Sequence, residues 1–106
     1  MRKKDKKSVN RILYDECTTL PKAKGNGQLV RRVSVNANNV ITRYSLAYIN
    51  HNLCRVDNGR VLGYDNAHGY HHRYYMGTIE SVRFFSFEQI EEQFQQEFEV
   101  LYGQNH

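Results

Sequence analysis

The sequence predicts an α+β fold, with an antiparallel sheet of about four to five strands in meander order, packed by a C-terminal amphipathic helix. Short stretches rich in Val, Ile and Tyr, with polar residues alternating among them, fill residues 28–85, and such stretches are typical of strands. Asn and Gly residues separate them closely, so we expect tight turns between antiparallel neighbours. Apolar residues at helical spacing follow over residues 86–102. The length of 106 residues fits one domain, residues 1–106.

The N-terminal segment, residues 1–24, is polar and basic, with eight Lys or Arg against three acids. We expect a flexible arm there, or the polar start of a short helix running into "RILYDE". The following stretch "TTLPKAKGNGQ" contains the single Pro and two closely spaced Gly, which indicates a loop. The strands should therefore begin after this loop.

The strand region contains two turn signals. Asn38 and Asn39 lie between "QLVRRVSVNA" and "VITRYSLAYINH", and Asn tolerates the positive φ of a tight turn. An Asn-Gly pair at 58–59, inside "LCRVDNGRVLGYD", predicts a hairpin with a two- or three-residue turn. In the second strand, alternation should place Tyr44, Leu46 and Tyr48 on one face. A last strand, "RYYMGTIESVRFF", contains Gly77, where we expect it to break.

The C-terminal helix has clear start and stop signals. Ser86 is a good N-cap, and Gln89 three residues later completes a capping box. Gly103 is expected to cap the C-terminus. One apolar stripe recurs at spacings of three and four and should face the sheet: Phe87, Ile90, Phe94, Phe98 and Leu101.

Charge is distributed unevenly along the chain. Residues 25–85 contain seven Arg and no Lys, whereas residues 86–106 contain five Glu and no basic residue. Arg is suited to bidentate phosphate contacts, so the middle of the chain is compatible with nucleic-acid binding as well as with an ordinary soluble surface. No apolar run is long enough to span a bilayer, and no signal-peptide pattern opens the sequence. We therefore expect a cytoplasmic protein with no membrane contact, in which Cys17 and Cys54 are unpaired.

The densest chemistry lies in "RVLGYDNAHGYHHRYYMGT", residues 60–78, which contains three of the five histidines. The spacing of His68, His71 and His72 fits no standard zinc pattern, so we expect neither a metal nor a cofactor. Metal-independent RNA cleavage is an alternative, because His can accept or donate a proton near neutral pH and Arg can hold a phosphate. Alternation in a strand would separate His72 and Tyr74 from His71, Arg73 and Tyr75. Structural roles are equally open: these side chains can simply pack, and "YDN" can build a turn.

Together with the helix "VRFFSFEQIEEQFQQEFEVL", this stretch resembles the TumE-like toxins of prokaryotic toxin–antitoxin pairs. The resemblance covers roughly residues 40–101. It places the family's Tyr-Asp-Asn turn on Tyr64, Asp65 and Asn66 and its His-Arg pair on His72 and Arg73. The family's second His falls on Tyr74, where this sequence departs. The resemblance implies a growth-inhibiting toxin neutralised by an antitoxin, commonly one with a helix-turn-helix domain.

The leading hypothesis is therefore a toxin that acts as a metal-independent ribonuclease. His72 would be the general acid or base, Arg73 would hold the phosphate, His68 or His71 would be the second proton-transfer group, and Asp65 would orient a histidine or hold the turn. RNA contacts are expected from Tyr64, Asn66, Tyr74, Arg60 and Arg43. The alternative is a module that binds RNA or the ribosome without catalysis, through the same Arg and Tyr residues. A third hypothesis is an interaction protein whose acidic helix, with Glu91 and Glu92, docks a basic partner.

Overall fold

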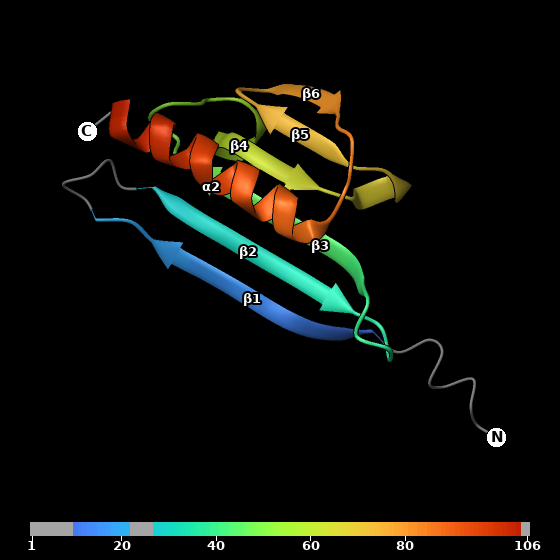
Figure 1. Cartoon of the computed structure of the whole chain (residues 1–106). Helices are drawn as coiled ribbons and strands as arrows, with labels where there is room; N and C mark the ends of the chain where they lie inside the picture. The colour runs from blue at the N-terminus through green and yellow to red at the C-terminus, as the bar shows by residue number, and fades with distance from the viewer. Residues whose placement is uncertain (1–9, 22–26, 105–106) are drawn as a thin grey trace.

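The chain folds into one antiparallel sheet with a helix across one of its faces (Figure 1). The computed structural model describes residues 10–21 and 27–104. The six strands follow one another in the order β1 to β6, each antiparallel to the last. The predicted α+β meander is confirmed, with more strands than expected. The elements are β1 (Arg11–Thr19), β2 (Gln28–Val35), β3 (Ile41–Ile49), β4 (Arg60–Asp65), β5 (His72–Tyr75), β6 (Thr78–Ser81) and α2 (Phe87–Gln104), with single 3-10 turns at η2 (Asp57–Gly59) and η3 (Ala67–Gly69).

The additional strands lie at the two edges of the sheet. Where an arm or a helix start was expected, residues 11–19 form β1 and pair with β2 from Arg11 to Thr19. This strand is exposed along almost its whole length, so it has no buried face and no hydrophobic alternation to reveal it. At the other edge, the strand that was expected to break at Gly77 is instead two antiparallel strands, β5 and β6, with a tight turn between them. Met76 and Gly77 both have positive φ, 49° and 90°, and they turn the chain from β5 into β6. Residues 1–9 of the predicted arm and residues 22–26 of the predicted loop lie outside the described residues.

The turn at Asn38-Asn39 is confirmed, while the Asn-Gly signal lies in a longer connection than expected. Asn39 has a φ of 63°, and the Asn36 side chain accepts hydrogen bonds from the backbone of Asn38 and Val40. Asn58 also has a positive φ, 54°. However, β3 ends at Ile49, and residues 50–59 form the whole connection to β4, so no strand precedes the Asn-Gly pair. The connection is closed by a hydrogen bond of 2.8 Å from the backbone N–H of residue 50 to the carbonyl of residue 59.

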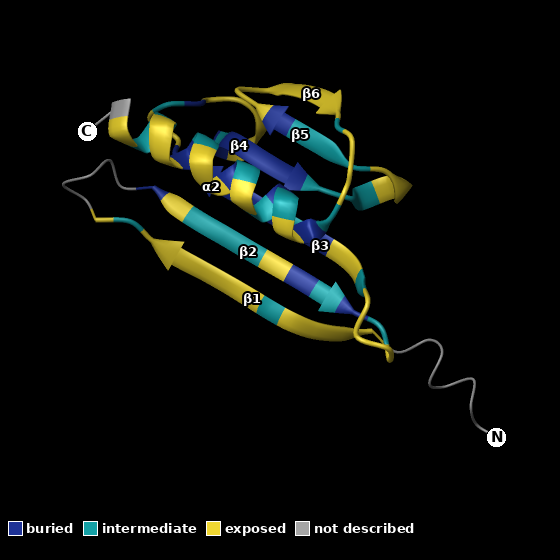
Figure 2. Ribbon diagram, viewed as in Figure 1, coloured by how far each residue is buried: buried dark blue, intermediate teal, exposed yellow. Residues whose placement is uncertain are grey.

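The core lies between α2 and the central strands β3 and β4, where Figure 2 shows the buried positions. On the sheet it contains the predicted row of Tyr44, Leu46 and Tyr48, and Leu62 and Tyr64 beside it. The helix contributes the predicted stripe, of which Phe87, Ile90, Phe94 and Phe98 are buried and Leu101 packs at the margin. We call the side of the sheet under α2 the helix face and the other side the open face.

The start of α2 is as predicted and its end is not. The backbone N–H of Gln89 donates to Ser86 Oγ at 3.1 Å, which is the N-cap bond. The reciprocal half of the capping box is not formed, because Gln89 Oε1, which would accept the N–H of Ser86, has no hydrogen-bond partner within the described residues. The prediction of a C-cap at Gly103 is wrong, since the helix continues to Gln104.

Candidate functional site

The connection between β4 and β5 is built by Asp65 and Asn66. Asp65 Oδ1 accepts the backbone N–H of Ala67 at 3.3 Å, a turn-closing bond of the kind Asp favours. The Asn66 side chain accepts the N–H of Tyr44 at 3.0 Å and donates to the carbonyl of Thr42 at 3.1 Å. The side-chain amide of Asn66 thus bonds to the backbone of β3 just beyond the end of β4, where the backbone pairing of the two strands stops. Both residues therefore shape the turn, and both the oxygen and the nitrogen of the Asn66 amide are hydrogen-bonded to β3.

This turn borders a polar depression at the end of the sheet where β3 begins, β4 ends and β5 begins. We call it the strand-end hollow. It has a volume of about 450 Å³, and it brings together two of the predicted histidines with one of the predicted arginines. Its lining residues are Asn10, Thr42, Arg43, Asn66, His68, Gly69 and His71.

Arg43 is the cation of the strand-end hollow. It is exposed, and it makes no ion pair or hydrogen bond with any residue in the described part of the chain. It also lines a second depression of about 340 Å³ on the open face, together with Arg32 and Asp65. Arg32, in contrast, is paired with Asp15 at 3.0 Å. Arg43 is therefore the arginine here that is available to an anion.

His71 is held in the hollow by two aromatic residues. Its Nδ1 is 2.9 Å from the Tyr44 hydroxyl, and its ring stacks on Phe84 with a centroid separation of 4.0 Å. Burial, together with the neighbouring His72, lowers the pKa of His71. Burial, with a smaller effect of Asp65, raises the pKa of Tyr44 to about 12, so the phenol stays protonated near neutral pH. When the neutral imidazole carries its proton on Nδ1, that N–H donates to the Tyr44 oxygen and leaves Nε2 unprotonated and able to accept a proton.

His72 points to the opposite face of the sheet, as alternation predicted, because it pairs with Asp65 in the β4–β5 register. Its side chain is 13% exposed, and its Nδ1 is 3.7 Å from Asp65 Oδ1, too far for a hydrogen bond. Within the described residues this buried nitrogen has no hydrogen-bond partner. The exposed ring of Tyr70 packs edge-on against the imidazole. His72 is thus separated by the sheet from the hollow that contains His71.

Arg60 and Tyr74 lie beside Asp65 on the open face. The Tyr74 hydroxyl donates to Asp65 at 3.2 Å, and the Arg60 guanidinium lies 3.5 Å above the Tyr74 ring. Arg60 also makes two hydrogen bonds to Asp57, at 2.7 and 3.0 Å. A Cβ at Gly63 would come within 2.8 Å of Arg60 Cδ, so the glycine makes room for this arginine. Arg60 is occupied by protein groups and is not free for a phosphate.

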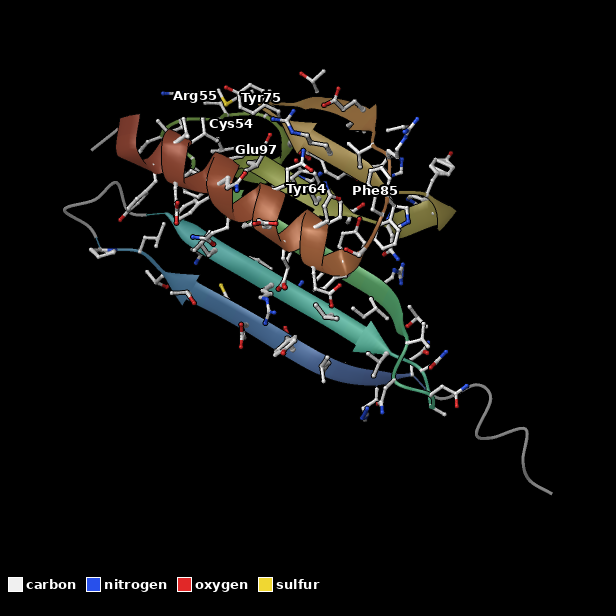
Figure 3. All side chains as sticks on the ribbon, viewed as in Figure 1. Cys54, Arg55, Tyr64, Tyr75, Phe85 and Glu97 are labelled. Carbon is white, nitrogen blue, oxygen red and sulfur yellow. The ribbon has the colours of Figure 1, made fainter. Side chains whose placement is uncertain are left out.

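Arg73 lies on the helix face, within an ion-pair network (Figure 3 labels Tyr64 and Glu97). It makes two hydrogen bonds to Glu97 on α2, at 3.1 and 3.3 Å, and one to Glu80 on β6, at 3.1 Å. Tyr64 donates to the same Glu97 at 2.7 Å. These contacts join the helix to β4, β5 and β6. The predicted pair of His72 and Arg73 is therefore split between the two faces, and the guanidinium is engaged by carboxylates.

Both tyrosines that were expected to contact RNA are buried. Tyr64 is 1% exposed and Tyr74 is 8% exposed, so, contrary to the expectation, neither presents a ring face on which a base could stack. The exposed aromatic residues near this end of the sheet are Tyr70, Phe84 and Phe85 (Figure 3 labels Phe85).

The strand-end hollow combines a cation without a carboxylate partner with two imidazoles. One of these, His68, is exposed and has a φ of 64° on the η3 turn. The other, His71, is positioned by Tyr44 and Phe84, which sequence reasoning did not assign to the site. No local pattern could have identified them, because Tyr44 is 27 residues from His71. A cation and two titratable groups in one polar depression are the elements required to bind a phosphate and transfer protons beside it.

Other features of the described chain do not suggest a different class of site. Across residues 10–21 and 27–104, no three His, Cys, Asp or Glu side chains gather as metal ligands would. None of the helices in this part of the chain is long and apolar enough to cross a membrane. Comparison with protein-family models, curated proteins and solved structures finds no match to this chain.

Proposed function

We propose that this protein is the toxin of a toxin–antitoxin pair and that it cleaves RNA without a metal at the strand-end hollow. The observation that carries the proposal is the placement of Arg43, free of any described carboxylate, beside His68 and His71. The resemblance of residues 40–101 to the TumE-like toxins supports the toxin role. Ribonuclease chemistry is the activity that fits these side chains best.

In the proposed reaction, the Nε2 atom of His71 accepts the proton of an RNA 2′-hydroxyl. The 2′ oxygen attacks the adjacent phosphorus, and the bond from phosphorus to the 5′ oxygen breaks. His68 donates a proton to the departing 5′ oxygen, while Arg43 stabilises the charge on the phosphate oxygens. The products are a 2′,3′-cyclic phosphate and a 5′-hydroxyl.

The lowered pKa of His71 suits it to the role of base, because the imidazole is neutral at physiological pH. The Tyr44 hydroxyl holds the ring through Nδ1, which keeps Nε2 as the exchanging atom. Asp65 and Asn66 act indirectly by fixing the turn that carries His68. His72 and Arg73, which face away from the hollow or lie in the Glu97 network, are assigned no chemical step.

The test is to incubate the purified chain with total RNA in EDTA and to analyse the ends of the fragments by mass spectrometry. We expect cyclic phosphate ends. Loss of one acid–base group lowers a rate by about 10²–10⁴-fold, so His71→Ala should reduce cleavage by at least 100-fold. His51→Ala, which changes an exposed histidine in the β3–β4 connection, is the matched control and should retain activity.

Three outcomes would contradict the proposal. If RNA stays intact while expression of the wild-type chain still arrests growth, the activity is not ribonucleolytic. If His72→Ala abolishes cleavage and His71→Ala does not, the reaction takes place on the open face. RNA binding without cleavage, weakened more by Arg43→Ala than by either histidine variant, would identify the non-catalytic module instead.

A further inference from the structure

A groove runs along the helix face beside α2, on the side away from the histidines. The helix packs on β3 and β4, and it leaves β1 and β2 uncovered next to it (Figure 1). Between α2 and these two strands lies a depression of about 480 Å³, which we call the α2–β2 groove. Leu29, Leu46 and Phe94 line it with apolar surface, and Glu16, Glu88 and Glu92 line it with carboxylates.

The charge of the groove is strongly negative. Arg31 is the one cation among its lining residues in the described chain, and it is already neutralised. Its Nε is 2.7 Å from Glu91, and its Nη1 is 3.6 Å from Glu16. Glu88 and Glu92, in contrast, are exposed and have no ion pair within the described residues. The groove therefore repels nucleic acid and attracts a cationic ligand.

The shape and composition of the groove specify that ligand more closely. Apolar surface between acidic groups is complementary to a segment with an apolar stripe and flanking Lys or Arg. An α-helix presents such a stripe through residues at i, i+3, i+4 and i+7. A helix placed on β1 and β2 would lie beside α2 and complete the layer that α2 begins, at the ~8–10 Å axis separation of packed helices.

We propose that the α2–β2 groove is a docking site for a basic amphipathic helix of a partner protein. This inference does not depend on the proposed ribonuclease activity, because the groove and the strand-end hollow share no lining residue.

The test uses a fluorescein-labelled 14-residue peptide of Leu and Lys, with Leu at helical spacing, and measures its anisotropy against the folded chain. We expect Glu92→Lys to raise the Kd at least tenfold. Glu99→Lys is the matched control, because residue 99 is seven positions further, on the same side of the helix but about 10 Å along it, and does not line the groove. It should change the Kd less than twofold.

A second variant removes the effect of charge from the test. Thr18 is exposed and lines the groove, and Thr18→Trp fills the space without altering any carboxylate, so it too should raise the Kd at least tenfold. Circular dichroism melting of each variant verifies that it is folded.

Four results would overturn the proposal. The wild-type chain could fail to bind the peptide at 100 µM, or Glu92→Lys and Glu99→Lys could weaken binding equally. A scrambled peptide of the same composition, without an apolar stripe, could bind as tightly, which would mean attraction by charge alone. Finally, the chain without peptide could be a dimer that Glu92→Lys dissociates, which would make a second copy of this chain the occupant.

Discussion

Replacement of Arg73 by Met tests whether this arginine joins α2 to the strands or is instead available to bind a phosphate. Met keeps most of the apolar length of the side chain and removes the guanidinium. If Arg73 joins α2 to the strands through Glu97 and Glu80, as the distances of 3.1–3.3 Å indicate, Arg73→Met should lower the free energy of unfolding.

The expected loss is about 2 kcal/mol. Hydrogen bonds to charged groups contribute about 1.5–3 kcal/mol each when they are well buried, and three are removed. The side chains of Arg73 and Glu97 are 21% and 30% exposed and Glu80 is 59% exposed, so solvent weakens the sum considerably. Glu97 also retains the hydrogen bond from Tyr64 and is not left without a partner.

The assay is urea unfolding followed by far-UV circular dichroism at pH 7. The free energy of unfolding of a small protein falls by about 1–3 kcal/mol per molar urea. The urea concentration at the unfolding midpoint should therefore be roughly 1 M lower for Arg73→Met than for wild type. Arg43→Met is the matched control, because it makes the same change at an exposed arginine with no described partner, and it should stay within about 0.5 kcal/mol of wild type. A stability of Arg73→Met equal to wild type, or an equal loss in both variants, would show that the contacts of Arg73 with Glu97 and Glu80 do not stabilise the fold.

Three further predictions follow from local geometry. Because burial lowers the pKa of His71, the imidazole binds a proton less readily in the folded state than in the unfolded state, so the free energy of unfolding falls as the pH drops below the unfolded pKa of about 6.5. In urea titrations from pH 7.5 to 5, the free energy of unfolding of His71→Gln should therefore depend less on pH than that of wild type. An equal pH dependence in the two proteins would contradict the lowered pKa of His71. Gly63→Ala places a methyl group against Arg60 and should cost about 1–3 kcal/mol in the same urea assay, whereas a neutral effect would mean that Arg60 moves away freely. Ser86→Ala removes the N-cap bond to Gln89 and should lower stability by about 1 kcal/mol, with Ser86→Thr, which retains a capping hydroxyl, close to wild type in thermal melts.

The parts of the fold that the sequence predicted are those with a buried face. Tyr44, Leu46 and Tyr48 alternate because every second side chain of β3 packs under α2, and the same alternation placed His71 and His72 on opposite faces. By contrast, β1 is exposed on both faces, so nothing in its composition separates it from an arm.

The site was predictable in its residue types and not in its pairings. The crowding of polar residues at 60–78 pointed to the part of the chain that borders the strand-end hollow, and Arg43 and His71, which line it, were among the expected residues. The sequence did not show which arginine lacks a carboxylate partner in the folded chain. Arg73 is engaged by Glu97, 24 residues away, which is a contact that exists only once α2 and the strands have assembled. Arg60 is engaged by the neighbouring Asp57 and by the Tyr74 ring on another strand.

A comparison of RNA cleavage by Arg43→Met and Arg73→Met tests directly whether Arg43 is the phosphate-binding cation of the strand-end hollow. Both rates are determined in EDTA under single-turnover conditions at a temperature where each variant is folded. If Arg43 is the phosphate-binding cation, its replacement should lower the rate by about 10²–10³-fold, the effect of removing one charge-stabilising group, while Arg73→Met should stay within threefold of wild type. A large loss for Arg73→Met together with wild-type rates for Arg43→Met would contradict the account and move the chemistry away from the strand-end hollow.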